Sequence, residues 1–290
     1  MSALKTLSNP FEPFDAALAG ALTANVQAAL QEDVGSGDLT GLLVPTGNVT
    51  AQVIVREEAV LCGAPWFEAV MHGLDAGIAI AWQHAEGDLM RANSVVCTLQ
   101  AQARALLTAE RSALNFLQLL SGVATSTRHH VELVAGTRAV VLDTRKTLPG
   151  LRLAQKYAVR VGGGHNQRLA LYDGILIKEN HIAAAGGVAL ALAAANKLQA
   201  GVTIQIEVEN LDQLQQALAA GATSVLLDNF TLDQMVDAVA ITAERALLEA
   251  SGGVNFATLR AIAETGVDRI SIGSLTKDIR ATDYSLRITG

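Results

Sequence analysis

The sequence predicts an α/β protein, built as a TIM-like barrel of about seven parallel strands that follows an N-terminal α+β domain. Half of the 290 residues are apolar and only 4% are aromatic, which favours strands and helices packed through small and branched side chains. From about residue 138 onward, apolar runs alternate with amphipathic helical segments. No GxGxxG motif leads from a strand into a helix, so a dinucleotide-binding sheet is disfavoured.

The first part of the chain predicts the α+β domain, which we place at residues 1–121. Apolar residues at helical spacing predict a helix over 14–31, and a turn-rich segment follows it. Short β-rich pieces separated by turn residues come next, and a helix from about 104 to 120 ends the domain. The expected strands cover residues 50–56, 78–82 and 94–99.

The barrel is expected over residues 122–275, where strands start about 15 to 30 residues apart, the spacing of βα units. Its second strand is the least regular, because three glycines at 162–164 interrupt the pattern at once. The strand candidates are residues 139–143, 158–161, 174–178, 203–207, 224–228, 245–249 and 269–273.

Charge and cysteine usage exclude several classes of protein. A net charge of −7 and the lack of any run of Lys and Arg disfavour nucleic-acid binding. Two cysteines without paired spacing disfavour a disulfide scaffold or a zinc site and favour a reducing compartment. The first residues lack the form of a signal peptide, and no apolar run approaches the roughly 20 residues that span a bilayer. We therefore expect a cytoplasmic protein without membrane partners.

Polar residues or glycines follow every strand candidate at its carboxyl end, where barrels of this kind carry their active sites. Four of these residues are cations from three strand ends: Arg145, Lys146, Arg168 and Lys178. Cations gathered at one cleft repel each other, so a ligand with several negative groups is expected there. The alternative is that they form structural ion pairs with Glu179, Glu207, Glu209 and Asp228.

The last two strand ends predict a phosphate site. Ser251, Gly252 and Gly253 precede a helix expected over 256–264, and Gly273 and Ser274 follow the final strand. Glycines let the backbone approach a phosphate, and a helix start offers N–H groups to it. The same residues also fit a plain turn. Among the carboxylates, Glu207 and Asp228 are candidates for ribose hydroxyls or Mg²⁺, or for balancing the nearby cations.

Seven ordered blocks of the chain resemble the quinolinate phosphoribosyltransferase family, also called carboxylating nicotinate-nucleotide pyrophosphorylase. The most specific is Asp143-Thr-Arg-Lys-Thr-Leu-Pro-Gly-Leu-Arg152, and the match extends from about residue 30 to the C-terminus. The other blocks are Glu110–Asn115, Ser121–Ala124, Gly162–Arg168, Leu176–Ile182, Glu207–Glu209 and Leu227–Phe230, with an upstream signature at Glu32–Thr40.

The resemblance implies that quinolinate reacts with phosphoribosyl pyrophosphate and Mg²⁺ to give nicotinate mononucleotide, pyrophosphate and CO₂. It implies that Thr144, Arg145, Lys146, Arg168 and Lys178 bind the two substrates, with Lys146, Lys178, Glu207 and Asp228 as the catalytic group. Glu207 and Asp228 would serve the ribose and the metal. The 5′-phosphate would lie at Ser251, Gly252, Gly253, Gly273 and Ser274. Arg111 would reach the neighbouring subunit's site in a homodimer or higher oligomer, and residues 276–290 would return to the N-terminal domain.

One residue departs from the family pattern: Gln167 stands where His is usual. Gln donates a hydrogen bond but carries no positive charge, so we favour a donor role for this substrate-binding position. Two rival functions remain. One is a related phosphoribosyltransferase for another anionic substrate, such as a non-decarboxylating nicotinate enzyme or the molybdenum-transport-associated homologue. The other is a non-catalytic anion-binding barrel.

Overall fold

The structure is a computed structural model that describes residues 16–289. The chain forms two compact units, each of which is described by itself. Of the described residues, the first unit comprises 16–128, 147–163 and 275–289, and the second comprises 129–146 and 164–274. Within the described residues, no helix combines the length and the apolar character needed to cross a membrane.

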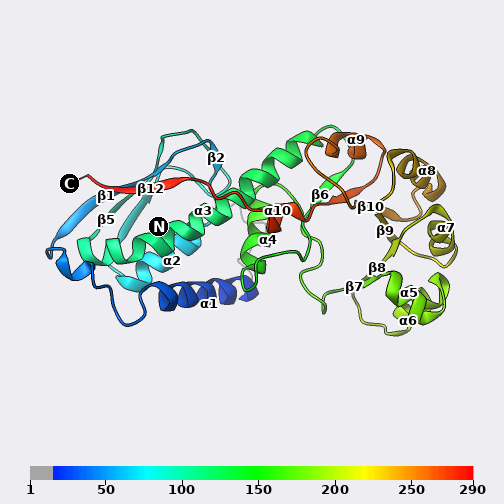
Figure 1. Cartoon of the computed structure of the whole chain (residues 1–290), viewed down its shortest axis with the longest axis horizontal. Coiled ribbons are helices and arrows are strands. Elements are labelled where there is room, and N and C mark those ends of the chain that lie inside the picture. Colours follow the sequence, from blue (N-terminus) through cyan, green and yellow to red (C-terminus); the bar gives the residue numbers. More distant parts are fainter. Residues whose placement is uncertain (1–15, 290) are drawn as a thin grey trace. The chain divides into compact units, whose positions relative to one another are not determined.

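The first unit is built on an antiparallel sheet in the order β12-β1-β5-β3. Figure 1 shows β12, from the C-terminal end of the chain, running beside β1. One face of β1 is fully buried at Ala51, Val53 and Val55, which places the core on that side. The strands are β1 (Asn48–Val55), β3 (Ala79–Trp82), β5 (Val95–Gln102) and β12 (Tyr284–Ile288), and a separate pair is formed by β2 (Ala59–Val60) and β4 (Leu89–Met90).

Helices provide the rest of this core. Trp66 and Phe67 on α2 are fully buried, and the Trp66 ring lies 5.5 Å from that of Tyr157. The helix expected over 14–31 is α1, although residues 14 and 15 lie outside the described residues. The helices are α1 (Ala16–Asp33), the 3₁₀ turn η2 (Gly41–Leu43), α2 (Ala64–Leu74), α3 (Ala103–Leu133), α4 (Arg152–Val161) and α10 (Ser274–Lys277).

The predicted second barrel strand, 158–161, is wrong, because these residues end helix α4 of the first unit. The apolar run looked like a strand because it is short and rich in Val. In the helix, Ala154, Tyr157 and Ala158 follow helical spacing and are all fully buried. Gly162 then lets the chain pass close to α3, since a Cβ there would lie 2.5 Å from the carbonyl oxygen of Ala124.

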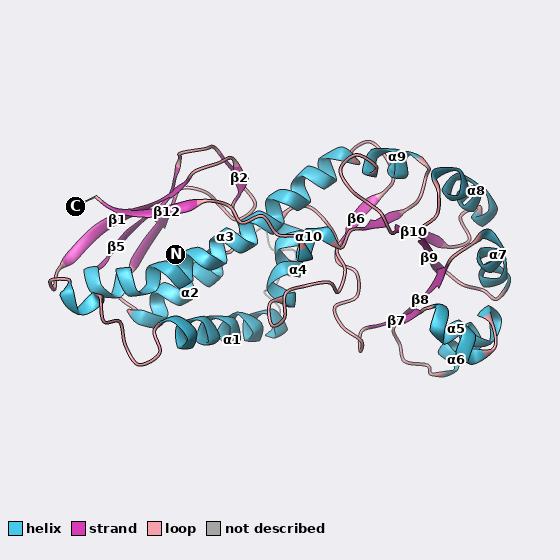
Figure 2. Cartoon of the chain, viewed as in Figure 1, coloured by secondary structure: helices cyan, strands magenta, loops and turns pink. Residues whose placement is uncertain are grey.

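The second unit is a parallel six-stranded sheet in the order β6-β11-β10-β9-β8-β7. Figures 1 and 2 show this sheet curving with helices on its outer side, as in an open α/β barrel. The other six predicted strands are confirmed. They are β6 (Val140–Leu142), β7 (Gly174–Ile177), β8 (Thr203–Val208), β9 (Ser224–Asp228), β10 (Leu247–Ser251) and β11 (Arg269–Ser271).

The outer helices connect successive strands in the manner of βα units. Helix α9 begins at Leu259, so the helix predicted from residue 256 starts three residues later than expected. The remaining helices of the unit are α5 (Glu179–Ala185), α6 (Val188–Lys197), α7 (Leu211–Ala219) and α8 (Leu232–Thr242).

An irregular segment accompanies the sheet edge at β6. His165 forms a parallel bridge with Leu142: its N–H donates to Val141 O at 2.8 Å, and its carbonyl accepts from Asp143 N at 3.2 Å. This bridge brings the residues after His165 to the carboxyl end of β6. The segment therefore reaches the same edge as the strand-end residues, although it is not a strand.

Candidate active site

A cavity of about 310 Å³ opens at the carboxyl ends of the parallel strands of the second unit. Parallel strands end at one edge of a sheet, so residues far apart in sequence meet there. The lining mixes cations, carboxylates and hydroxyls. It consists of Thr144, Arg145, Lys146, Gln167, Arg168, Leu176, Lys178, Glu207, Leu226, Asp228, Glu249, Ser251 and Ser271.

The four predicted cations all line this cavity. Arg145 and Lys146 follow β6, Arg168 belongs to the segment after His165, and Lys178 follows β7. Burial lowers the pKa of the Arg168 guanidinium, and the charge of Arg145 lowers it further. Two guanidinium groups that repel each other in a partly buried cleft favour an anion between them.

Lys178 forms an ion pair with a carboxylate of the cavity. Its Nζ lies 3.1 Å from Glu207 Oε2 on β8. The backbone N–H of Lys178 donates to Nδ1 of His181 at 3.0 Å, which holds Lys178 at the first turn of α5. The alternative prediction of structural ion pairs therefore applies at least to this pair.

Glu207 faces two opposing influences. Burial has the largest effect and raises the pKa of Glu207. The hydrogen bond and the charge of Lys178 lower this pKa, and the charge of Asp228 raises it. Asp228, at the end of the neighbouring strand β9, accepts a hydrogen bond at 3.0 Å from Nδ2 of Asn229, the next residue in the chain. A cation near Glu207 and Asp228 would relieve their mutual repulsion, as would a hydroxyl that donates to both.

The loop after β10 brings backbone to the rim of the cavity. Gly252 and Gly253 have φ values of 95° and 63°, in the left-handed region that favours glycine. A Cβ on Gly252 would lie 3.1 Å from the backbone nitrogen of Asn229 and would overlap its side chain. Ser251 lines the cavity, whereas Gly252 and Gly253 do not.

The loop after β11 lies against Lys146. A Cβ on Gly273 would be 3.0 Å from Lys146 Cδ, so the missing side chain makes room for the lysine stem. Ser274 begins the short helix α10. Neither Gly273 nor Ser274 lines the cavity itself.

Two polar residues inside the barrel were missed by the sequence analysis. Glu249 on β10 is 1% exposed, and Gln205 on β8 is 6% exposed. The Nε2 group of Gln167 donates to both of them, at 3.0 Å to Glu249 Oε2 and 2.8 Å to Gln205 Oε1. The Gln167 side chain, for which a donor role was predicted, thus donates to side chains in the interior of the barrel. The available signal was strand alternation, because Glu249 precedes Ser251 by two residues.

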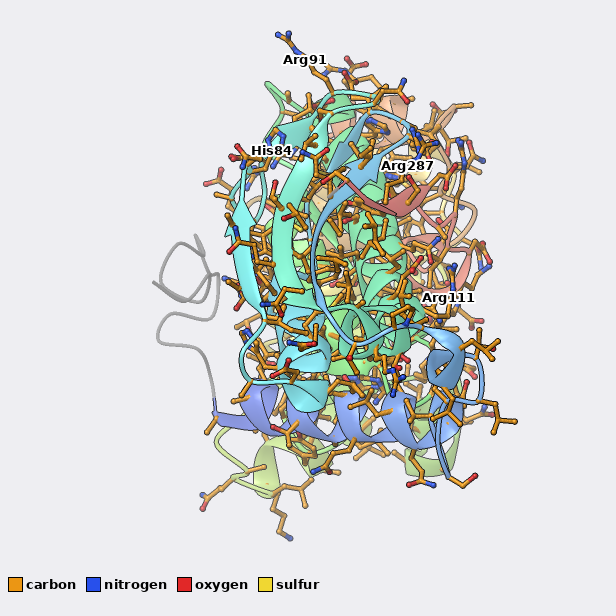
Figure 3. The ribbon with its side chains drawn as sticks, turned by 90° about the vertical axis from the view of Figure 1, so that its left-hand side faces the viewer. His84, Arg91, Arg111 and Arg287 are labelled. Carbon is orange, nitrogen blue, oxygen red and sulfur yellow. The ribbon has the colours of Figure 1, made fainter. Side chains whose placement is uncertain are left out.

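Arg111 lies on α3 in the first unit and is exposed. Figure 3 shows it on the outside of this unit and well away from Arg91 and His84, so it is not part of a basic cluster with them. No group of three or more His, Cys, Asp or Glu residues suited to a metal ion occurs between residues 16 and 289.

The curved parallel sheet, with its cationic cavity at the strand ends, is the arrangement of an α/β-barrel protein whose site suits anionic ligands. The chain belongs to the quinolinate phosphoribosyl transferase family: the model of the family's N-terminal domain matches residues 38–121, and that of its C-terminal domain matches residues 123–287. The predicted family and fold class are confirmed.

Relatives and solved structures agree with this membership. The chain is 43% identical to the nicotinate-nucleotide pyrophosphorylase [carboxylating] of Mycobacterium leprae, with 90% of this chain and 95% of the relative covered. It is 39% identical to a probable enzyme of the same name from Bacillus subtilis, over 89% and 90% of the two chains. The structure of the nicotinate-nucleotide pyrophosphorylase from Francisella tularensis superposes with a TM-score of 0.91 at 46% identity, covering 93% and 96%.

Proposed function

We propose that this chain transfers the phosphoribosyl group of phosphoribosyl pyrophosphate to quinolinate and releases pyrophosphate, CO₂ and nicotinate mononucleotide, a step of NAD biosynthesis. The observation that carries the proposal is the single cavity lined by four cations from three chain segments. Quinolinate has two carboxylates and the sugar donor has several phosphate charges, so both substrates need such a cavity. The names of the family and of the relatives supply the identity of the substrates.

We assign the planar guanidinium groups of Arg145 and Arg168 to the quinolinate carboxylates, because a guanidinium binds a carboxylate with two parallel hydrogen bonds. Lys146 and Lys178 fit the pyrophosphate, which needs compact positive charge rather than a planar fork. Ser251, the two glycines after it, Gly273 and Ser274 fit the 5′-phosphate. Thr144 fits the bound ligands through its hydroxyl group, since it lines the cavity beside Arg145.

The reaction needs few proton transfers. The bond between C1 of the ribose and the pyrophosphate oxygen breaks, and the pyridine nitrogen forms a new bond to C1. Its charge then draws the electron pair of the breaking C–C bond onto ring C2 as the 2-carboxylate leaves as CO₂, and C2 takes a proton from water. The lysines stabilise the departing pyrophosphate, and the arginines hold the ring nitrogen in line with C1.

Mg²⁺ would enter with the sugar donor, where it neutralises pyrophosphate charge. Glu207 and Asp228 are the carboxylates placed to hold it or the ribose hydroxyls, since both line the cavity on adjacent strands.

The test of the function is an assay with phosphoribosyl pyrophosphate, Mg²⁺ and either quinolinate or nicotinate. We expect product and CO₂ from quinolinate and none from nicotinate. Turnover of nicotinate would favour the rival enzyme. Binding of the sugar donor without product would favour a non-catalytic barrel.

Arg145→Ala tests the assignment of the cationic cavity. The variant should keep its fold, because Arg145 is only partly buried, and it should lose at least about 100-fold in kcat/KM for quinolinate. Arg138→Ala is the matched control, since Arg138 lies in the same unit and pairs with Asp268 outside the cavity. Equal turnover by the two variants would contradict the assignment.

We also propose that the active form is a homodimer, in which Arg111 of one subunit completes the site of the other. Arg111 is an exposed cation outside the unit that carries the cavity, and the family resemblance gives it this role. Mixing Arg111→Ala with Lys178→Ala protein should restore activity to a fraction of the sites, because each mixed dimer holds one intact site. No recovery after subunit exchange would exclude sharing of this residue.

The two buried free cysteines suit a cytoplasmic location.

A further inference from the structure

Glu249 is a buried carboxylate that the proposed reaction does not use. It lies on β10, two residues before Ser251, lines the cavity and is 1% exposed. Between residues 16 and 289 its carboxylate forms no ion pair and is held by two amide groups. Burying a carboxylate costs free energy, so we expect the hydrogen bonds of Glu249 to fix side-chain orientations that an apolar residue at this position would not fix.

The carboxylate fixes the orientation of two amides in series. Gln205 Nε2 donates to Glu249 Oε2 at 2.9 Å, and Gln205 Oε1 accepts from Gln167 Nε2 at 2.8 Å. Gln167 Nε2 also donates to Glu249 Oε2 at 3.0 Å. Rotating either amide by 180° would set an amide oxygen against the carboxylate oxygens, so only one orientation is compatible with Glu249.

This orientation determines what Gln167 offers to the next residue. With its Nε2 directed at Glu249, the Oε1 atom of Gln167 points back and accepts from the Arg168 backbone N–H at 2.6 Å. On the other side, Asp143 accepts from Gln167 N at 2.9 Å and from Asn166 Nδ2 at 2.7 Å. The segment that carries Arg168 is therefore held between two buried carboxylates.

The tether compensates for a missing strand. Residues 166–168 have no ladder of strand hydrogen bonds, and the Arg168 guanidinium donates to Gly174 O at 3.0 Å. A side chain on an irregular segment is placed less accurately than one on a strand, unless side-chain contacts fix the backbone. Glu249 and Gln205, on strands of the barrel, supply these contacts through the interior.

We propose that Glu249 and Gln205 are positioning residues for the acceptor substrate: through Gln167 they hold Arg168 where it binds a quinolinate carboxylate. The inference rests on the proposed function, because that function makes Arg168 a substrate ligand. It concerns the acceptor selectively, since the side-chain hydrogen bonds of Glu249 and Gln205 among the described residues join only these two residues and Gln167, and none goes to the loops assigned to the 5′-phosphate.

Glu249→Gln is the direct test. The amide has one acceptor oxygen in place of two and adds an N–H₂ group that faces other donors, so the two glutamines lose their fixed orientation. We expect KM for quinolinate to rise about tenfold or more, while KM for phosphoribosyl pyrophosphate changes less than about twofold. Glu244→Gln, an exposed change of the same chemistry in the same unit, should leave both constants unchanged.

A double variant separates positioning from general damage to the cavity. In the Arg168→Lys background, Glu249→Gln should add less than about twofold to KM for quinolinate, because residues that act as one unit are not additive. An unchanged KM for quinolinate in Glu249→Gln, an equal rise in both constants, or full additivity with Arg168→Lys would each overturn the inference.

The wild-type enzyme must turn over quinolinate before these variants are compared. Failure there would refute the proposed function, whereas wild-type turnover without a selective effect of Glu249→Gln would refute the positioning role alone. If Glu249→Gln does not fold, Gln205→Met decides the question. It removes one donor to Glu249 and should give the same selective rise in KM for quinolinate, and an unchanged KM would overturn the inference.

Discussion

The buried carboxyl of Glu86 predicts that the protein becomes less stable as the pH rises from 4.5 to about 7. Glu86 is 6% exposed and accepts from Gly63 N at 2.6 Å and Ala64 N at 3.2 Å, at the start of α2. Burial raises its pKa from 4.5 to about 7, although the hydrogen bonds from Gly63, Cys62, Ala64 and Tyr157 lower it. The desolvation cost of the charged form therefore exceeds the gain from its donors.

The sign and size of the effect follow from the difference between the folded and unfolded states. Because the pKa is raised in the folded state, the contribution of Glu86 to stability is fully present below pH 4.5. This contribution is lost as the pH rises through about 7. Above that pH, Glu86 causes no further change in the free energy of unfolding. Each pH unit between these values costs about 1.4 kcal/mol, so the total loss is on the order of 3 kcal/mol.

Glu86→Gln tests this prediction by urea unfolding at several pH values between 5 and 8. The amide is neutral throughout, so the variant should lack this component, and its free energy of unfolding should fall with pH by about 3 kcal/mol less than that of the wild type. Glu132→Gln, an exposed change on α3, should retain the wild-type pH dependence. Equal pH dependence of the wild type and Glu86→Gln would refute the reasoning.

Two further predictions concern backbone placement. Gly252→Ala should cost about 1–3 kcal/mol of stability and raise KM for the sugar donor more than Gly253→Ala does, because both glycines have positive φ but only Gly252 has no room for a Cβ. Thermal unfolding measures the stability and steady-state kinetics measure KM; equal effects of the two substitutions would contradict the crowding argument. Gln155→Leu should lower the free energy of unfolding by about 1–3 kcal/mol per lost hydrogen bond. Gln155 is fully buried, accepts from Leu148 N at 2.7 Å and donates to Thr276 O at 2.8 Å. Urea unfolding at one pH measures this loss, and wild-type stability of the variant would show that the two hydrogen bonds contribute nothing.

The strands of the second unit could be predicted because each is a short apolar run that ends in a polar residue or a glycine. β8 and β9 show this pattern, with Glu207 and Asp228 at their carboxyl ends. Residues 158–161 have the same local pattern, yet they lie in α4, where tertiary packing against α3 decides the conformation. Local periodicity cannot distinguish these two outcomes in a run of four residues.

Strand alternation places Glu249 on the same face of β10 as Ser251, but the hydrogen-bonded group that it forms inside the barrel could not be predicted, for a related reason. Gln205 and Glu249 stand in the middle of strands whose neighbours are apolar, so their positions suggest packing rather than chemistry. Their meaning depends on Gln167, which is 38 and 82 residues away in the chain. Only the folded arrangement shows that these amides and the carboxylate form one hydrogen-bonded group.

The set of cavity residues predicted from the sequence includes Arg168 even though the strand expected before it does not exist. The prediction assumed that a parallel strand would deliver Arg168 to the carboxyl edge of the sheet. Instead, helix α4 ends at Val161, and the bridge between His165 and Leu142 returns the chain to the end of β6. The position of Arg168 thus depends on side-chain tethers rather than on a strand, which is why changes at the buried Glu249 should affect acceptor binding so selectively.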